Sequence, residues 1–410
     1  MKNEFIKVKY LILGAGPSGL TFANMLLRRG ESSFIVVEKE DEAGGLCRST
    51  TVDRAPFDIG GGHFLDVRRP EVTKFLFEFM PEEEWNIFER DSRIELIAEG
   101  NRYEINHPLE ANIWQLPKDI QDKYLESVKK AGCNNSKPMP DKFISWITWK
   151  LGDKIAKDYM IPYNTKMFAD ELDELGTYWL EKLPNVDYED TLRSCREHRA
   201  YGSQPGHATF YYPKKYGYGE VWLRMAQKLG DALVTGISAS KIDIADRMVT
   251  LEDGAKIQAE NIVTTVPWNS FDEISGLPDE IVNSVKKLKH SSIETRYVPQ
   301  NLETKAQWIY VPDVNKPYHR ILVRHNFAPE SFGYWLETRK ERCGEYEDDN
   351  YAYMNEYAYP LNTIDKPTVI GSLLDACEKN RVYGLGRWGE HSHYNSDLVV
   401  SKAMELSQKI

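Results

Sequence analysis

Short apolar runs alternate with amphipathic segments at the start of the chain. Residues 9–13 and 34–37 are continuous apolar runs that predict two buried strands, and residues 20–29 carry apolar side chains at helical spacing. A strand, a helix and a second strand in this order predict a βαβ unit. We therefore expect an α/β fold that begins almost at once.

Glycines fill the turn between the first strand and the helix. Gly14 suits a tight turn, Gly16 lets the backbone approach a pyrophosphate, and Gly19 lets the helix pack closely on the strand. The N–H groups that open the helix favour phosphates, and Glu38, which follows the second strand, would accept hydrogen bonds from a ribose. The unit predicts a Rossmann-like dinucleotide site, although the same glycines would also suit a turn that only packs.

The residues after Glu38 favour FAD over NAD. Gly44 and Gly45 form a doublet, and Arg48 follows closely. This segment resembles the extended fingerprint of two-dinucleotide-binding-domain flavoproteins, in which the doublet lets the backbone approach the FAD pyrophosphate. Three more glycines precede His63 and indicate a place where the backbone passes close to a flat or bulky group such as a flavin ring.

The rest of the chain divides into three kinds of pattern. Residues 111–204 are mostly helical in pattern and predict an inserted helical domain. Residues 205–270 return to strands, and we assign them, with 1–110 and 365–410, to a discontinuous FAD-binding domain. Residues 271–364 alternate polar and apolar side chains, which predicts a second, antiparallel sheet forming a substrate domain on the far wall of a cleft.

Composition narrows the class of protein. A length of 410 residues predicts two or three domains, and 41% hydrophobic residues suit a soluble globular protein. A net charge of −11 argues against non-specific binding to nucleic acid or to an anionic membrane, and no run approaches a membrane span. Five scattered cysteines and a start without a signal region predict no structural disulfide, no zinc or other metal site, and a cytoplasmic location.

Segments along nearly the whole chain resemble the UDP-galactopyranose mutase family, nearer to its eukaryotic branch than to its bacterial one. Their shared order and spacing carries the resemblance, since no single match is decisive. The matching segments are Gly62-His63, Tyr103 to Asn106, Leu116 to Lys118, Met160 to Lys166, Trp179-Leu180, Ala208 to Pro213, Trp308 to Tyr310, Arg320, Tyr359-Pro360, Gly386-Arg387 and Asn395.

The resemblance implies a flavoprotein isomerase of polysaccharide biosynthesis, which interconverts the pyranose and furanose forms of a nucleotide-diphosphate sugar. FAD is active in its reduced form, and its N5 is the nucleophile at the anomeric carbon, although no net redox occurs. Cations and phenols aimed at the departing diphosphate would stabilise the transition state. The expected partner is a small nucleotide sugar, with no nucleic acid and no membrane, and oligomer formation is left open.

The resemblance also implies roles for individual residues. Arg320 matches an arginine that grips two phosphate oxygens, which lysine could not do, and Tyr310 and Tyr359 match tyrosines near the phosphates. With His63 they form the expected catalytic set. The expected cofactor contacts are Gly14, Gly16, Ser18, Gly19, Glu38, Lys39, Gly45, Leu46, Gly61, Gly62, His63 and Arg387. The expected substrate contacts are Trp308, Lys182, Asn106, Asn164, Phe327, His393 and Asn395.

The chain departs from the family around the diphosphate. The family's second arginine is expected just after Leu180, where Lys182 supplies a point charge instead. Phe327 and His393 stand where tyrosines are expected. Each charge-assisted bond lost in this way would cost about 1.5 to 3 kcal/mol, so UDP-galactose as the substrate is in doubt.

Three functions remain open at this point. The first is a mutase on a nucleotide sugar or related glycosyl compound. The second is an FAD-dependent oxidoreductase of the amine oxidase or protoporphyrinogen oxidase-like superfamily, because a fold does not fix a function. The third is a cofactor-binding protein that has lost catalysis. An arginine with several tyrosines suits a phosphate better than an apolar substrate, which favours the first, although aromatics on strands would also suit ordinary core.

Overall fold

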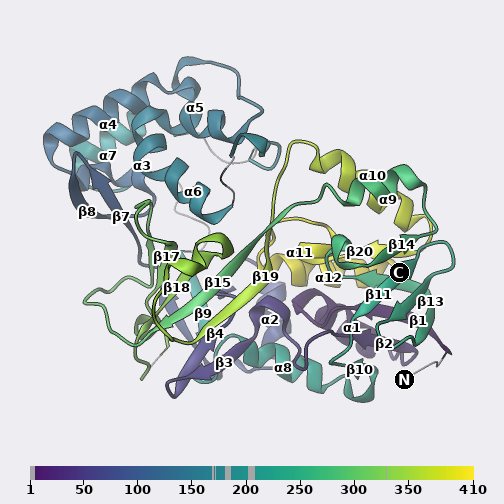
Figure 1. The fold of residues 1–410 in the computed structure, drawn as a ribbon. Coiled ribbons are helices and arrows are strands. Elements are labelled where there is room, and N and C mark those ends of the chain that lie inside the picture. Colours follow the sequence, from purple (N-terminus) through teal and green to yellow (C-terminus); the bar gives the residue numbers. More distant parts are fainter. Residues whose placement is uncertain (1–4, 169, 171, 181–185, 202–207, 329) are drawn as a thin grey trace.

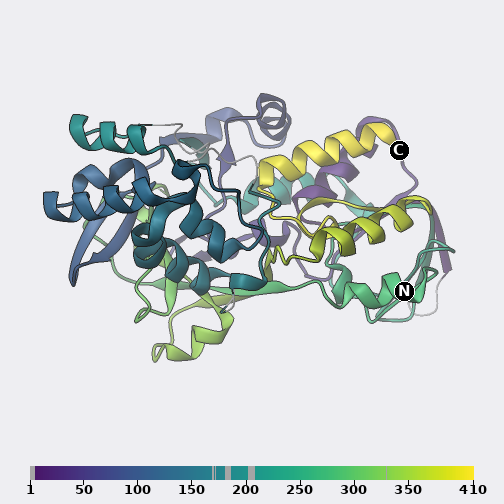
Figure 2. The same ribbon diagram turned by 90° about the horizontal axis from the view of Figure 1, so that it is seen from above.

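Two large sheets organise the molecule, one in each half (Figure 1). The computed structural model describes residues 5–168, 170, 172–180, 186–201, 208–328 and 330–410. The helices α3 to α7 gather in the half that holds the second sheet, whereas α1, α10 and α12 lie with the first sheet and both chain ends (Figures 1 and 2). The predicted α/β class with a helical insertion is confirmed.

The first sheet has eight strands, with β1 (Phe5–Leu13) near its centre. β1 pairs in parallel with β2 (Phe34–Val37) on one side and with β13 (Lys256–Thr264) on the other. The strand order is β10-β2-β1-β13-β12-β11-β14, and β20 pairs in parallel with the end of β13. The other strands are β10 (Leu233–Val234), β11 (Ala239–Asp243), β12 (Met248–Leu251), β14 (Glu273–Ser275) and β20 (Val382–Gly384).

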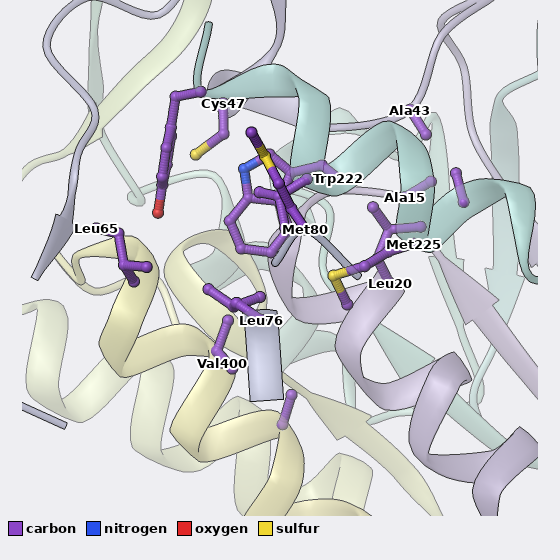
Figure 3. Close-up of a cluster of buried hydrophobic side chains, with 14 of the residues drawn as sticks. Ala15, Leu20, Ala43, Cys47, Leu65, Leu76, Met80, Trp222, Met225 and Val400 are labelled. Atoms are coloured by element: carbon purple, nitrogen blue, oxygen red, sulfur yellow. The ribbon is translucent and has the colours of Figure 1, made fainter. Parts of the chain in front are cut away.

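The predicted βαβ unit is confirmed, and its helix anchors the core of this half. α1 (Pro17–Arg28) begins with a proline, which suits the first helical position because that position needs no N–H donor. It packs against α8 (Gly219–Gln227) and α12 (Ser396–Lys409). Figure 3 shows the resulting cluster, in which Leu20, Trp222 and Val400 are completely buried. Burial of a side chain of this size contributes roughly 1.5 to 3 kcal/mol.

The second sheet has seven strands in the order β19-β15-β18-β17-β16-β7-β8. Its two longest strands, β15 (His290–Val298) and β19 (Ala352–Pro360), run toward the first sheet (Figure 1). The other five are β7 (Ser92–Ala98), β8 (Asn101–Asn106), β16 (Trp308–Tyr310), β17 (Tyr318–Leu322) and β18 (Tyr334–Arg339). β15 and β19 therefore connect the two halves.

Strand pairing differs from the predicted division of the chain in two places. β7 and β8 lie within residues 1–110, yet β7 pairs in parallel with β16, so this sheet is mixed rather than purely antiparallel. β14 lies within residues 271–364, yet it pairs with β11 of the first sheet. Both differences arise because pairing depends on partners distant in sequence, which a local hydrophobic pattern does not specify.

The helical insertion packs on the second sheet. Ile94 and Leu96 of β7 and Ile105 of β8 are buried against it. Its helices are α3 (Leu109–Asn112), α4 (Lys118–Lys130), α5 (Phe143–Ile155), α6 (Ile161–Met167) and α7 (Tyr188–Glu197).

The remaining helices are α2 (Pro70–Phe77), α9 (Asp279–Val285), α10 (Lys366–Glu378) and α11 (Gly386–Gly389). The remaining strands are the hairpin of β3 (Ser49–Val52) and β4 (Ala55–Asp58), and a small sheet of β5 (Leu65–Asp66), β6 (Trp85–Glu89) and β9 (Thr209–Pro213).

The part of the chain that the structure describes shows neither a membrane-spanning helix nor a cluster of metal ligands. None of the helices there is both long and apolar enough to cross a bilayer. No group of three or more histidine, cysteine, aspartate or glutamate side chains in the same part is arranged to hold a metal ion. The five cysteines are free thiols.

Candidate active site

A cavity of about 560 Å³ lies at the carboxyl ends of the central strands of the first sheet. Its walls include Gly14, Glu38 and Thr265, which directly follow β1, β2 and β13. Ligands of open α/β sheets bind at this edge, and small-molecule sites span roughly 300 to 1,000 Å³. The cavity therefore has the place and the size of a site for a large cofactor.

The glycine turn forms one wall of this large cavity. Gly14 has a φ of +95°, and a Cβ there would lie 2.4 Å from Thr265 Oγ1. A Cβ on Gly19 would lie 2.0 Å from the carbonyl oxygen of Gly14, so only glycine lets α1 approach β1 this closely. Gly16 and Gly45 lie against each other, because a Cβ on Gly45 would be 3.1 Å from the Cα of Gly16. The wall is therefore bare backbone.

Glu38 holds this turn as well as lining the large cavity. Its carboxylate accepts hydrogen bonds from the backbone N–H groups of Ala15 at 2.7 Å and Glu40 at 3.0 Å. The sequence had indicated only a contact with a ribose. The residues expected at the cofactor that line the cavity are Gly14, Gly16, Ser18, Glu38, Lys39, Gly45, Leu46, His63 and Arg387.

A smaller cavity of about 200 Å³ adjoins the large one, and His63, Arg387 and Ser396 line both. It lies beside the second sheet, because its lining residues include members of β16, β17 and β19. The segments 60–66 and 393–397 complete much of its wall. The residues expected at the substrate or the catalytic centre that it brings together are His63, Trp308, Arg320, Tyr359, His393 and Asn395. Gly62, expected at the cofactor, lines this cavity instead of the large one.

Arg320 is held from two sides. Its Nη2 donates to the hydroxyl of Tyr359 at 3.2 Å and to the carboxylate of Glu337, which is 1% exposed. Glu337 also accepts a hydrogen bond from Gly62 N at 3.1 Å, and His319 Nε2 lies 3.4 Å from it. Burial alone would raise the pKa of Glu337, but the charge of Arg320 and the contact with His319 lower it to about 2. The arginine and the carboxylate therefore form a pair with no net charge.

The histidines of the smaller cavity are neutral at physiological pH. Burial, followed by the charge of Arg387, lowers the pKa of His63 to about 3. Burial and the charges of Arg387 and Arg320 lower the pKa of His393 to about 3 as well. Burial raises the pKa of Tyr359, although Arg320 opposes the change, so this phenol keeps its proton. The cavity thus offers neutral hydrogen-bonding groups beside its arginines.

Two of the expected aromatic residues have other surroundings. Tyr310 lines neither cavity, but its hydroxyl accepts a hydrogen bond at 2.8 Å from Arg90, which lines the smaller one. Phe327 is fully buried, and its ring packs 5.1 Å from Phe64 and 5.0 Å from Tyr212 between ring centroids. Phe327 therefore belongs to the hydrophobic core, and the tyrosine expected at this position would not reach the cavity from there.

Other expected residues also lie outside both cavities. Asn164 caps a carbonyl within its own helix, since its Nδ2 donates to Met160 O at 2.7 Å. Asn106 ends β8, where its backbone N–H donates to the side chain of Gln115 at 2.8 Å. Gly19 and Gly61 line neither cavity, because Gly19 lies under the glycine turn and Gly61 lies against Glu337. Lys182 lies outside the described residues.

Several residues in or beside the smaller cavity were not identified from the sequence. Arg90 lies in a charged segment between β6 and β7, and Glu337 lies on a strand that reads as a mixed polar pattern. Asp66 and Asp397 also line the cavity. A glutamate within an otherwise buried strand would indicate an ion pair, because buried carboxylates are paired. The sequence does not identify the partner.

The sequence matches that follow each cover a minor part of the chain. Residues 12–79 match a family described as an NAD(P)-binding Rossmann-like domain. The inactive all-trans-retinol 13,14-reductase of Danio rerio is 28% identical over 90 residues, which are 22% of this chain and 15% of that protein. The match to the reductase thus spans a small part of the length of that relative, and the family match covers the predicted dinucleotide unit.

Solved structures match over nearly the whole chain. A crystal structure of reduced UDP-galactopyranose mutase has a TM-score of 0.85 at 24% identity and covers 98% of this chain and 93% of its own. A putative protoporphyrinogen oxidase from Exiguobacterium sp. has a TM-score of 0.72 at 13% identity over 100% and 99% of the two chains. Putrescine oxidase has a TM-score of 0.66 at 14% identity over 99% of each. The chain therefore has the fold of UDP-galactopyranose mutase, which it shares with these oxidases, and the resemblance inferred from its sequence is confirmed at the level of fold.

Proposed function

We propose that this chain is an FAD-dependent mutase that interconverts the pyranose and furanose forms of a nucleotide-diphosphate sugar. The observation that carries the proposal is the pair of adjoining cavities that share His63, Arg387 and Ser396. A cofactor in the large cavity would thus lie next to a polar cavity that holds arginines, a phenol and neutral histidines. Such a lining suits a sugar joined to phosphates better than an apolar substrate.

The large cavity suits FAD. Gly16 and Gly45 present bare backbone at the start of α1, where orphan N–H groups and the helix dipole favour a pyrophosphate. Glu38 lies where a ribose would bind. His63 Nδ1 is buried without a hydrogen-bond partner among the described residues, at the boundary of the two cavities, and would accept a bond from or donate one to the cofactor ring.

Reduced FAD would supply a nucleophile for the anomeric carbon, so that no substrate is oxidised or reduced overall. The residues of the chain would position the sugar and stabilise the charge of the departing diphosphate. Arg320 and Tyr359 are coupled by a hydrogen bond, and they would direct an N–H and an O–H toward a phosphate oxygen. His393 and Asn395 would meet the hydroxyl groups of the sugar.

The test is an anaerobic assay of the purified protein with UDP-galactofuranose and a panel of other nucleotide sugars. Each sugar is incubated with and without dithionite, and the products are separated by chromatography. We expect isomer formation only with the reduced flavin and without net consumption of reductant.

The same assay separates the other two functions. Flavin reduction by an amine or an alcohol, without isomerisation, would assign the chain to the oxidoreductases, whose fold it shares. Bound flavin with no turnover under any reducing condition would assign it to a cofactor-binding protein that has lost catalysis.

A further inference from the structure

Among the described residues, Arg320, Asp66 and Asp397 of the smaller cavity are paired with opposite charges, whereas Arg90 and Arg387 are not. Arg320 is neutralised by Glu337. The carboxylate of Asp66 pairs with Arg68 at 2.7 Å, and that of Asp397 pairs with Arg69. A cavity with only such pairs would hold little attraction for an anion, because opposite charges in contact cancel at the distance of a ligand.

Arg387 also lines the large cavity and donates to the carbonyls of Ala358 and Tyr394, whereas Arg90 lines only the smaller of the two cavities. The Nε of Arg90 donates to Ser92 Oγ at 2.6 Å and its Nη2 to the hydroxyl of Tyr310 at 2.8 Å, so both partners are neutral. Among the described residues no ion pair joins Arg90 to a carboxylate, and the adjacent Asp91 pairs with Arg93 instead. Arg90 therefore lines the smaller cavity with its charge uncompensated.

The guanidinium of Arg90 is also held in a fixed orientation. It lies 4.5 Å from the centre of the Trp308 ring, a distance typical of a cation–π contact, and its backbone N–H donates to Ala208 O at 2.8 Å. Trp308 itself packs 4.3 Å from Phe64 between ring centroids. A planar guanidinium fixed on an aromatic ring is ready to bind two oxygens of a phosphate with little further loss of entropy.

The charge of Arg90 also acts on its neighbours. Burial and, after it, the charge of Arg90 lower the pKa of His107 to about 3. The ring of His107 lies 4.8 Å from that of Tyr310. His107 is therefore neutral rather than cationic, so the positive charge of this group of side chains lies on Arg90.

We propose that Arg90 binds the anionic diphosphate of the substrate and takes the place of the second diphosphate arginine that this chain lacks. This inference rests on the proposed function, because it names the residue that recognises the diphosphate in the same cavity. Arg320, bound to Glu337, orients Tyr359 and contributes N–H donors, and Arg90 contributes an unpaired positive charge.

The test measures the dissociation constants of UDP and of inorganic pyrophosphate for the flavin-loaded protein by titration calorimetry at low and at high salt. The variants are Arg90→Ala, Arg90→Gln and, as a matched control, Arg93→Ala. Arg93 lies on the neighbouring strand β7, but Asp91 at 2.7 Å and Glu104 at 2.9 Å already neutralise it. Flavin content and thermal unfolding are recorded for every variant, so that a folding defect is distinguished from a binding defect.

We expect both Arg90 variants to bind UDP about 10- to 100-fold more weakly, with a smaller dependence on salt than the wild type. Arg90→Gln keeps a hydrogen-bond donor without the charge, so its loss of affinity identifies the charge as the cause. The Arg93 variant is expected to bind within twofold of the wild type.

Unchanged UDP affinity and salt dependence in both Arg90 variants would overturn the inference, and isomerisation by the wild type would still uphold the proposed function. If the wild type binds inorganic pyrophosphate but not UDP, and Arg90→Ala loses that binding, the role of Arg90 in binding a diphosphate is supported, whereas a UDP-linked sugar is excluded as the substrate. Wild-type protein that binds neither anion would overturn both.

Discussion

The two cavities of this protein are built in different ways. One wall of the large cavity is bare backbone at Gly14, Gly16 and Gly45, which lie in and just after the first βαβ unit. The smaller cavity is lined by side chains such as Arg90 and Arg320, which come from separate strands and loops. A site of bare backbone depends on the absence of side chains, whereas a site of charged groups depends on how those groups pair.

This difference has a chemical consequence. A glycine-lined wall binds a pyrophosphate through backbone N–H groups and the helix dipole. These groups do not depend on the side chains of the protein, so the same wall can bind a pyrophosphate in many different proteins. A wall of arginines and carboxylates can change its net charge by a single substitution, and with it the ligand that it favours. We therefore expect the smaller cavity to determine the substrate specificity and the large cavity to accept a wider range of ligands.

The largest effect is expected when a side chain is added to the glycine wall of the large cavity. In Gly16→Val the new side chain would enter the large cavity, whereas the fold should tolerate it, since a Cβ at Gly16 meets only the Cα of Gly45 at 3.8 Å. We expect a folded protein without bound flavin, measured by flavin absorbance and thermal unfolding.

The matched control for that variant is Gly371→Ala on α10, where no other atom lies within 4 Å of an added Cβ. It should keep the flavin and gain up to about 1 kcal/mol from its better helix propensity. Flavin retained by Gly16→Val would exclude the glycine turn from the cofactor site.

Loss of Arg320 should abolish most turnover without loss of the flavin. Arg320→Ala removes donors from the smaller cavity, frees Tyr359 and leaves Glu337 as an unpaired buried carboxylate. We expect kcat/KM to fall by about 100- to 1,000-fold, because each charge-assisted bond contributes about 1.5 to 3 kcal/mol. Flavin content, read from the same samples, should be unchanged. Unaltered kinetics would remove Arg320 from the site.

Substitution of Glu337 tests the pairing itself. Its pKa falls from 4.5 in the unfolded chain to about 2 in the folded one, so its carboxylate stabilises the fold above pH 4.5 and loses this effect as the pH falls toward 2. Glu337→Gln should therefore lower the free energy of unfolding by about 3 kcal/mol at pH 7 and by much less near pH 2, as urea titrations would measure.

The control is Glu341→Gln, since the Glu341 carboxylate is 61% exposed and its ion pair with Arg339 should contribute no more than about 1 kcal/mol. An equal loss of stability at pH 7 and pH 2 in Glu337→Gln would contradict the ionised pair. Glu337→Gln should also tighten the binding of UDP, because Arg320 would then carry an unpaired positive charge. This result would show that ligand binding in the smaller cavity depends on how its charges pair.

The smallest effect is expected at Phe327, which the family resemblance placed at the substrate. Because its ring is buried among aromatic side chains, Phe327→Tyr should add an unpaired hydroxyl and cost about 1 to 3 kcal/mol of stability, with no gain in turnover. Phe332→Tyr, at a position that is 43% exposed, should change stability by less than about 0.5 kcal/mol. Faster turnover in Phe327→Tyr would place that position in the cavity after all.

The sequence by itself determined the α/β class, the dinucleotide unit and most of one cavity wall. Gly14, Gly16, Gly19 and Glu38 act through local backbone geometry, and local geometry is encoded by neighbouring residues. The same reason explains why the helical insertion was predicted, since helical spacing is a local pattern.

Only the tertiary structure decided the charges of the smaller cavity. It pairs Arg320 with Glu337 across neighbouring strands, leaves Arg90 without a carboxylate among the described residues, and buries Phe327 in the core. These relations join residues that are far apart in the chain, and the free energy of a charge depends on its partners and its burial. The residue types were visible in the sequence, but their electrostatic roles followed from the contacts that the fold creates.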